Sequence, residues 1–226
     1  MKVLAIIPAY NEEACLENTV REFVRVCPDV DYLVVNDGSR DRTPMVCDEL
    51  GLNHVDLPIN TGLSSGFRCG MKYAYRHGYD AAVQFDADGQ HMPQVVPMMA
   101  QAMQEQQTNI VIASRGMAGS SAVGARGLGA RLITWLIKRT TGQTILDPTS
   151  GMRMYDRSII ERYARDFDMS PEPDTISVLM REGAKVVEVP AEMRERQGGE
   201  SYLKSWSSIS YMLRTCLSLL LFQWFR

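Results

Sequence analysis

Residues 82–91 read AVQFDADGQH, an apolar run followed by two carboxylates two positions apart and then by a glycine. This pattern predicts a buried strand that runs into a metal-binding loop. Because side chains alternate along a strand, we expect Asp86 and Asp88 to project to the same side where the strand ends. Carboxylate oxygens can hold Mg²⁺ or Mn²⁺, which usually keep waters and take a substrate's phosphates as further ligands. The stretch therefore predicts a phosphorylated substrate.

Short apolar runs alternate with helical patterns on both sides of this stretch. Buried strands are predicted at residues 3–7, 32–35, 54–57, 81–85, 110–113 and 185–189. Helices are predicted at residues 12–26, 43–50, 63–77, from Met92-Pro93 onward, after a glycine-rich loop at 116–129 up to about residue 141, at 157–164 and at 175–183. Asn11 is the expected N-cap of the first helix. Strand-helix-strand repetition predicts an α/β domain with a mostly parallel sheet flanked by helices.

Polar clusters follow three of these strands. Residues 8–10 read PAY, residues 36–38 read NDG and residues 86–88 read DAD. Ligands of open parallel sheets bind outside the carboxyl ends of the strands. We therefore expect the three clusters to converge on one crevice.

Composition limits the classes of function. With 226 residues and 45% hydrophobic residues, the chain is long enough for one large α/β domain. A net charge of -3 and a pI near 5.7 exclude sequence-wide attraction to nucleic acid. The five cysteines are scattered without metal-ligand spacing, which is typical of free thiols in a reducing cytosol. The apolar run at the N-terminus is far too short for an export signal.

The C-terminal segment differs in composition from the rest of the chain. Residues 1–200 are predicted as the catalytic domain, and residues 201–226 as one amphipathic helix that carries tryptophan, tyrosine, leucine and basic side chains. Its most apolar part, residues 217–225, is too short to span a bilayer, which takes about 20 apolar residues. The composition fits a helix lying on a membrane surface. It fits equally a helix that packs on a partner or folds back onto the domain.

Several motifs, in this order, resemble those of the family 2 glycosyltransferases of the GT-A fold. They are IIPAYNEE at residues 6–13, VVNDGSRD at 34–41, NTG at 60–62, DADGQ at 86–90, DPTSGMR at 147–153 and VPAEMRERQGGES at 189–201. The resemblance covers about residues 1–204 and is strongest to the polyprenyl-phosphate branch, which is similar to dolichol-phosphate mannose synthase. Asn36 stands where many members have a second aspartate.

The resemblance implies a UDP- or GDP-sugar donor and a Mg²⁺ or Mn²⁺ cofactor. The residues that match the family's base- and ribose-binding positions are Pro8, Ala9, Tyr10, Glu12 and Asp37. Those that match its metal and diphosphate group are Asp86, Asp88 and Gln90, with Asp88 the main candidate ligand. Arg115, Arg126 and Arg131 correspond to family arginines near the diphosphate, and a guanidinium fork suits phosphate oxygens.

The acceptor side is less defined. Relatives that build polysaccharides carry an acidic pair near Glu172 and Asp174, where one carboxylate deprotonates an acceptor hydroxyl. A lipid phosphate is already ionised and needs no strong base, so the catalytic base stays unassigned. The candidate acceptor-binding residues are Asp147, Arg194, Arg196, Ser201 and Lys204, and the basic ones among them suit an anionic lipid head group.

The sequence therefore predicts an inverting, metal-dependent transferase that moves a sugar to polyprenyl phosphate. It is expected in the cytoplasm, peripherally bound to the inner face of the membrane through its terminal helix, a small membrane partner or a second copy. An alternative acceptor is a sugar hydroxyl of a growing polysaccharide or glycolipid. A haloacid-dehalogenase-type phosphohydrolase is disfavoured, because residues 86–89 do not follow the first strand and no adjacent aspartates occur downstream. An inactive membrane-docking homologue is disfavoured by the intact Asp37, Asp86 and Asp88.

Overall fold

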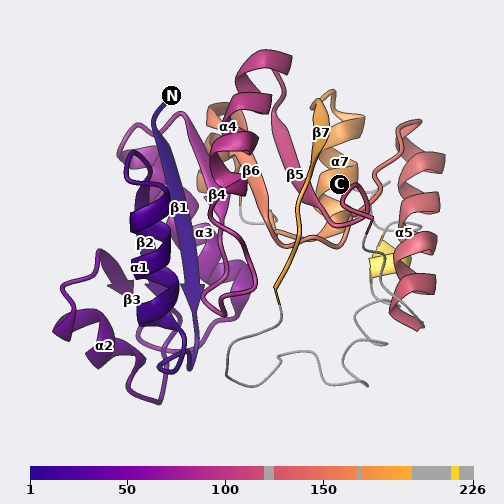
Figure 1. The fold of residues 1–226 in the computed structure, drawn as a ribbon. Helices are drawn as coiled ribbons and strands as arrows, with labels where there is room; N and C mark the ends of the chain where they lie inside the picture. The colour runs from indigo at the N-terminus through magenta and orange to yellow at the C-terminus, as the bar shows by residue number, and fades with distance from the viewer. Residues whose placement is uncertain (120–124, 167–168, 195–214, 219–226) are drawn as a thin grey trace.

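The computed structural model describes residues 1–119, 125–166, 169–194 and 215–218 (Figure 1). A central sheet has the strand order β3-β2-β1-β4-β6-β5-β7. The strands are β1 (Val3–Ala9), β2 (Asp31–Asn36), β3 (His54–Asp56), β4 (Ala81–Gln84), β5 (Ile110–Ser114), β6 (Arg153–Asp156) and β7 (Val186–Pro190). The helices are α1 (Leu16–Val26), α2 (Thr43–Glu49), α3 (Leu63–Arg76), α4 (Val95–Gln106), α5 (Ala125–Thr141), α6 (Arg157–Arg165) and α7 (Pro173–Arg181). The predicted α/β class and mostly parallel sheet are confirmed.

Helices cover both faces of the sheet. Alternate residues of β1 enter different apolar cores, with Ile7 in the core that includes α1 and α4 and Ile6 in the core that includes α3, α6 and α7. Both side chains are fully buried. This two-sided burial explains why β1 reads as a continuous apolar run.

The strand β6 was not predicted. It pairs antiparallel with both β4 and β5 and so lies inside the sheet. Its sequence RMYD is short and begins and ends with charges, which hides it from a search for apolar runs. The charge of Arg153 is tolerated although the residue is 2% exposed, because its guanidinium donates hydrogen bonds to the carbonyl oxygens of Pro148 and Pro171.

The expected start of the first helix was wrong. Helix α1 begins at Leu16, and Asn11 is not its N-cap. Asn11 has a left-handed backbone (φ 56°), and its Oδ1 accepts a hydrogen bond from the N–H of Arg40 at 2.8 Å. The N–H of Asn11 in turn donates to the Ser39 hydroxyl. The short polar side chain therefore joins the loop after β1 to the loop after β2 instead of capping a helix.

The C-terminal helix expected at residues 201–226 lies largely outside the described residues. Residues 215–218 are helical, and Thr215 is buried. The Ser218 hydroxyl donates a hydrogen bond to Oδ2 of Asp174 in α7, so this part of the segment contacts α7. No helix among the described residues is long and apolar enough to cross a membrane.

Candidate active site

The loops after β1, β2 and β4 meet at one edge of the sheet. β1 lies between the other two strands, with Ala9 beside Asn36 and Ile6 beside Gln84. These strands are parallel, so their carboxyl ends point the same way. Residues 8–10, 36–38 and 86–88 therefore follow strand ends at the same edge of the sheet, as predicted.

The carboxylate of Asp37 is buried and holds the loop that leads into α3. Its Oδ1 accepts hydrogen bonds from the N–H and the hydroxyl of Thr61, and its Oδ2 accepts one from the N–H of Gly62, each at 2.8 Å. Gly38 follows in a left-handed conformation (φ 63°), and a Cβ there would lie 2.4 Å from the backbone of Ile59. Asp37 thus fixes the loop of residues 59–62 beside the loop after β2.

Asp86 and Asp88 lie in a turn and not on the strand itself. β4 ends at Gln84, one residue earlier than predicted, so the alternation of a strand does not set their relative direction. The Gln84 amide donates to Oδ1 of Asp86 at 2.9 Å, and Oδ1 of Asp88 accepts from the N–H of Gln90 at 3.0 Å. Both carboxylates are half-buried. The turn therefore holds two partly solvated carboxylates at the crevice.

The donor set of this turn fits a cation that is completed by substrate. In the described part of the chain, no group of three or more His, Cys, Asp or Glu residues could hold a metal ion. Two carboxylates and the Gln90 amide form the kind of site where Mg²⁺ keeps waters and binds phosphate oxygens of a substrate. Gln90 is tied to the chain just after β7, because its Nε2 lies 3.4 Å from the carbonyl oxygen of Arg194 and its backbone carbonyl accepts the N–H of Arg194.

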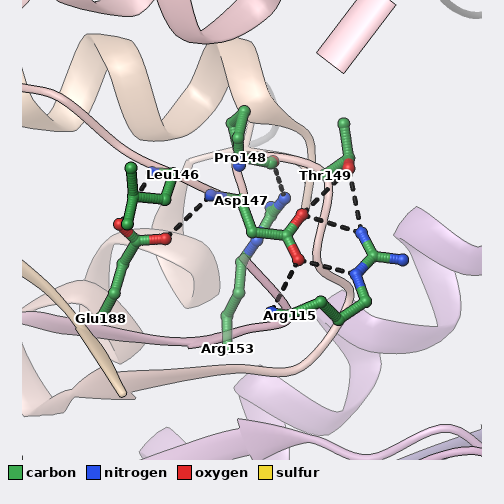
Figure 2. Close-up of polar contacts among 7 residues, drawn as sticks. All are labelled: Arg115, Leu146, Asp147, Pro148, Thr149, Arg153 and Glu188. Carbon is green, nitrogen blue, oxygen red and sulfur yellow. Dashed lines mark hydrogen bonds and ion pairs between the residues drawn. The ribbon is translucent and has the colours of Figure 1, made fainter. Parts of the chain in front are cut away.

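Arg115 and Asp147 form a two-pronged ion pair across the loops after β5 and α5 (Figure 2). Nε of Arg115 donates to Oδ2 of Asp147 at 2.6 Å, and Nη2 donates to Oδ1 at 2.8 Å. The same carboxylate accepts the N–H of Arg115 and the hydroxyl of Thr149. We predicted one of these residues for the donor diphosphate and the other for the acceptor, and the structure joins them.

The ion pair sets the charge state of both partners. Burial raises the pKa of Asp147, but the hydrogen bonds and positive charge of Arg115 more than offset it, so the net pKa lies below its usual value. The hydrogen bond to Asp147 raises the pKa of Arg115 against the opposing effect of burial. The carboxylate is therefore ionised and a poor proton acceptor at neutral pH. Figure 2 shows the remaining guanidinium nitrogen, Nη1, pointing away from the carboxylate.

Glu188 in β7 supports this pair and was missed by the sequence reasoning. Its two carboxylate oxygens accept the backbone N–H groups of Leu146, at 2.7 Å, and of Asp147, at 2.9 Å (Figure 2). The only signal in the sequence is one carboxylate inside an otherwise apolar strand, VVEVP. That signal shows an unusual residue but not its partner, which is about 40 positions away in the chain.

Gly151 connects the two halves of the site. It ends the turn that carries Asp147, and a Cβ added to it would lie 3.2 Å from Oδ2 of Asp86. That separation is tighter than nine in ten real Cβ contacts, so the Asp86 side chain would have to move by a few tenths of an ångström. A glycine here lets the DPTSG turn approach the Asp86-Asp88 turn closely.

Other predicted site residues have different surroundings. Arg194 pairs with both carboxylate oxygens of Glu22 in α1, at 2.8 and 3.0 Å, so its charge is directed at the domain. Asp174 accepts hydrogen bonds from the N–H of Thr175 and from Ser218. Arg131 is exposed on α5. The Arg126 side chain and residues 196, 201 and 204 lie outside the described part of the structure.

The fold, and the edge of the sheet where the loops after β1, β2 and β4 meet, define a GT-A glycosyltransferase. The model of the family described as "Glycosyl transferase family 2" matches residues 4–164, and the chain belongs to this family. An undecaprenyl-phosphate mannosyltransferase of Micrococcus luteus is 31% identical over 218 residues, covering 89% of this chain and 87% of that protein. A polyprenol monophosphomannose synthase of Mycolicibacterium smegmatis is 30% identical over 217 residues, covering 88% and 80%.

Solved structures give the same fold. Glucosyl-3-phosphoglycerate synthase from Mycobacterium tuberculosis, in complex with Mn²⁺, UDP-glucose and phosphoglyceric acid, superposes with a TM-score of 0.72. The match covers 98% of this chain and 79% of that chain at 17% identity. At this identity the likeness shows the fold alone.

Proposed function

We propose that this glycosyltransferase moves a sugar from a UDP- or GDP-sugar to polyprenyl phosphate, with inversion and with Mg²⁺ or Mn²⁺ as cofactor. The observation that carries the proposal is the Asp86-Asp88 turn, which lies at the same sheet edge as the loops after β1 and β2. The names of the two relatives supply the class of acceptor.

On the donor side, residues 8–10 and Asp37 bind the base and ribose. Asp86, Asp88 and Gln90 face the diphosphate. A cation bound there would offset the charge that develops on the leaving nucleoside diphosphate as the bond to the sugar breaks. Arg126 and Arg131 bind the diphosphate from helix α5.

On the acceptor side, the ionised phosphate of the lipid is itself the nucleophile. Arg115 presents Nη1 to a phosphate oxygen while Nε and Nη2 stay paired with Asp147. The lowered pKa of Asp147 argues that it orients Arg115 and does not take a proton. Glu172 and Asp174 are then not needed as a base, and Asp174 holds residue 218.

The enzyme works at the cytoplasmic membrane surface in this proposal. Residues 201–226 form a separate amphipathic segment, and Arg196, Ser201 and Lys204 contact the lipid head group. In the described part of this segment, Thr215 is buried and Ser218 donates a hydrogen bond to Asp174 of α7, which favours a segment that folds back onto the rest of the chain at this point. A small membrane partner or a second copy supplies further attachment.

The test is transfer from a panel of labelled UDP- and GDP-sugars to a short-chain polyprenyl phosphate, with Mg²⁺, Mn²⁺ or EDTA. We expect metal-dependent labelling of the lipid from one donor and its loss in Asp88→Asn. Polyprenol without the phosphate is the matched acceptor control and is expected to stay unlabelled. If the donor binds and only a carbohydrate acceptor is labelled, the acceptor is a sugar hydroxyl and the proposal is wrong.

A further inference from the structure

His91 is buried directly behind the Asp86-Asp88 turn. Its side chain is 1% exposed, and its ring packs edge-on against Phe85 with the ring centroids 5.6 Å apart. Nδ1 of His91 accepts a hydrogen bond from the backbone N–H of Asp86 at 3.0 Å. Since Nδ1 acts as an acceptor, the neutral ring must carry its hydrogen on Nε2.

This Nε2–H has no hydrogen-bond partner among the described residues. The nearest carboxylate oxygen is Oδ2 of Asp86, at 3.6 Å, which is beyond hydrogen-bond range. A buried donor without an acceptor is rare and destabilises a protein by about 1–3 kcal/mol. The folded chain therefore keeps the unsatisfied Nε2–H group of His91 next to the carboxylate of Asp86, on which the nucleotide-sugar site depends.

The two carboxylate oxygens of Asp86 have different surroundings. Oδ1 is held by the Gln84 amide at 2.9 Å, whereas Oδ2 lies between Nε2 of His91 and the bare backbone of Gly151. A shift of a few tenths of an ångström brings Oδ2 into hydrogen-bond range of Nε2–H. Gln84 and His91 would then hold one oxygen each, which fixes the plane of the carboxylate.

We propose that His91 is a positioning residue whose Nε2–H orients the Asp86 carboxylate toward the cation and diphosphate of the donor. This inference rests on the proposed function and adds a residue to its donor site. Partners that hold a metal-binding side chain from behind typically contribute 10- to 100-fold to metal affinity. The Nε2–H group of His91 thus completes its hydrogen bond to Oδ2 of Asp86 when the site is filled.

Two amide substitutions test the roles of the two ring nitrogens of His91 separately. His91→Asn keeps an oxygen near Nδ1, which can accept the N–H of Asp86, but it removes the donor toward Oδ2. His91→Gln keeps a nitrogen near Nε2 but removes the acceptor. His77→Asn is the matched control, because His77 is exposed at the end of α3.

The readout is Mn²⁺ affinity, followed by the electron spin resonance of free Mn²⁺ with saturating UDP or GDP. We expect about 10- to 100-fold weaker binding in His91→Asn, measured at a temperature where the variant is folded. His91→Gln is expected to bind Mn²⁺ nearly as well as the wild type but to melt lower, and His77→Asn to change neither property. Equal Mn²⁺ affinity in the wild type and His91→Asn overturns the inference.

A measurement on the unmodified protein does not depend on how the variants fold. In the imidazole ¹⁵N–¹H spectrum, the Nε2–H proton of His91 is expected to move downfield when Mg²⁺ and the nucleotide are added together. An unmoved proton, or a wild type that binds no Mn²⁺ with either nucleotide, also overturns the role of His91. If sugar is transferred in the presence of EDTA, the proposed glycosyl transfer holds and only the roles of the cation and of His91 are wrong. The absence of any transfer would instead contradict the proposed function itself.

Discussion

Asp147 shows how one buried side chain can organise a site. Its carboxylate accepts hydrogen bonds from the backbone and side chain of Arg115 and from Thr149. A buried carboxylate is tolerated only when it is paired and hydrogen-bonded in this way. The pairing also holds three atoms of a long, flexible arginine, so Arg115 is arranged before any phosphate arrives.

Replacing Asp147 by Asn should reduce stability in a pH-dependent way. The pKa of Asp147 is lower in the folded than in the unfolded chain, so its contribution is complete above the unfolded value of about 3.9 and is lost as pH falls through the folded value. We expect Asp147→Asn to unfold about 1–3 kcal/mol more easily at pH 7, less than for a fully buried pair because Arg115 is one-third exposed. Urea unfolding at pH 7 and near pH 3 measures this difference.

The control for this change is Asp29→Asn, an exposed carboxylate before β2. It should alter stability little at either pH. A destabilisation by Asp147→Asn that is equally large at both pH values would show that the ion pair is not its cause.

At the scale of elements, β7 supports a turn from a neighbouring part of the fold. β7 pairs with β5, and the register sets Glu188 beside Ile112. From there the carboxylate reaches the two N–H groups of Leu146 and Asp147. The last strand of the sheet therefore determines where the Asp147 turn, and through it Arg115, is held.

We expect Glu188→Gln to weaken binding of the phosphate substrate. The amide has the same size but one acceptor oxygen, so one backbone N–H loses its partner, which destabilises the turn by about 1–3 kcal/mol. KM for polyprenyl phosphate should rise more than kcat falls. The effect on KM should shrink in an Arg115→Lys background, because Glu188 acts through Arg115.

Glu192→Gln is the control, since Glu192 is exposed just beyond β7. Steady-state kinetics and melting curves of the wild type, the two single variants, the double variant and this control separate the effect on KM from the effect on stability. Additive changes in KM for Glu188→Gln and Arg115→Lys would contradict the proposed coupling.

Helix α3 gives a test of packing that is independent of function. Two of its glycines are buried, but a Cβ at Gly70 would lie 2.3 Å from a side-chain carbon of Ile6, whereas a Cβ at Gly66 meets nothing closer than 3.8 Å. Gly66→Ala should stabilise the protein by up to about 1 kcal/mol through helix propensity. Gly70→Ala should destabilise it by about 1–3 kcal/mol, because overpacking pushes α3 away from β1. Thermal unfolding measures both, and stabilisation by both changes would contradict the close contact.

The sequence predicted most elements and the donor edge, for reasons that differ between residues. The strands with buried, apolar side chains and the polar turns at their ends are encoded locally, so β1, β2 and the residue 86–88 turn were predictable. β6 was not, because Arg153 is neutralised by carbonyl oxygens that only the folded chain supplies. Glu188 and the joining of Arg115 to Asp147 were missed for the same reason, since their partners are distant in sequence.

At the scale of the whole molecule, the sheet divides the site between two halves. β1, β2 and β4 carry the loops assigned to the donor, and β5, β6 and β7 surround the turn assigned to the acceptor phosphate (Figure 1). The halves meet where Gly151 lies against Asp86. Under the proposed function, the nucleotide-sugar and the lipid phosphate meet at this contact between the Asp147 turn and Asp86.

The most direct test of this account is the chemistry of the product formed from natural acceptors. Wild-type protein and Asp88→Asn would be incubated with a labelled donor and lipid-depleted or intact bacterial membranes, and organic-soluble label would be treated with mild acid. We expect label only with intact membranes and wild-type protein, and we expect acid to release it as free sugar because a glycosyl phosphate hydrolyses far faster than a glycoside. Label that survives mild acid, or that enters water-soluble polysaccharide instead, would contradict transfer to a lipid phosphate.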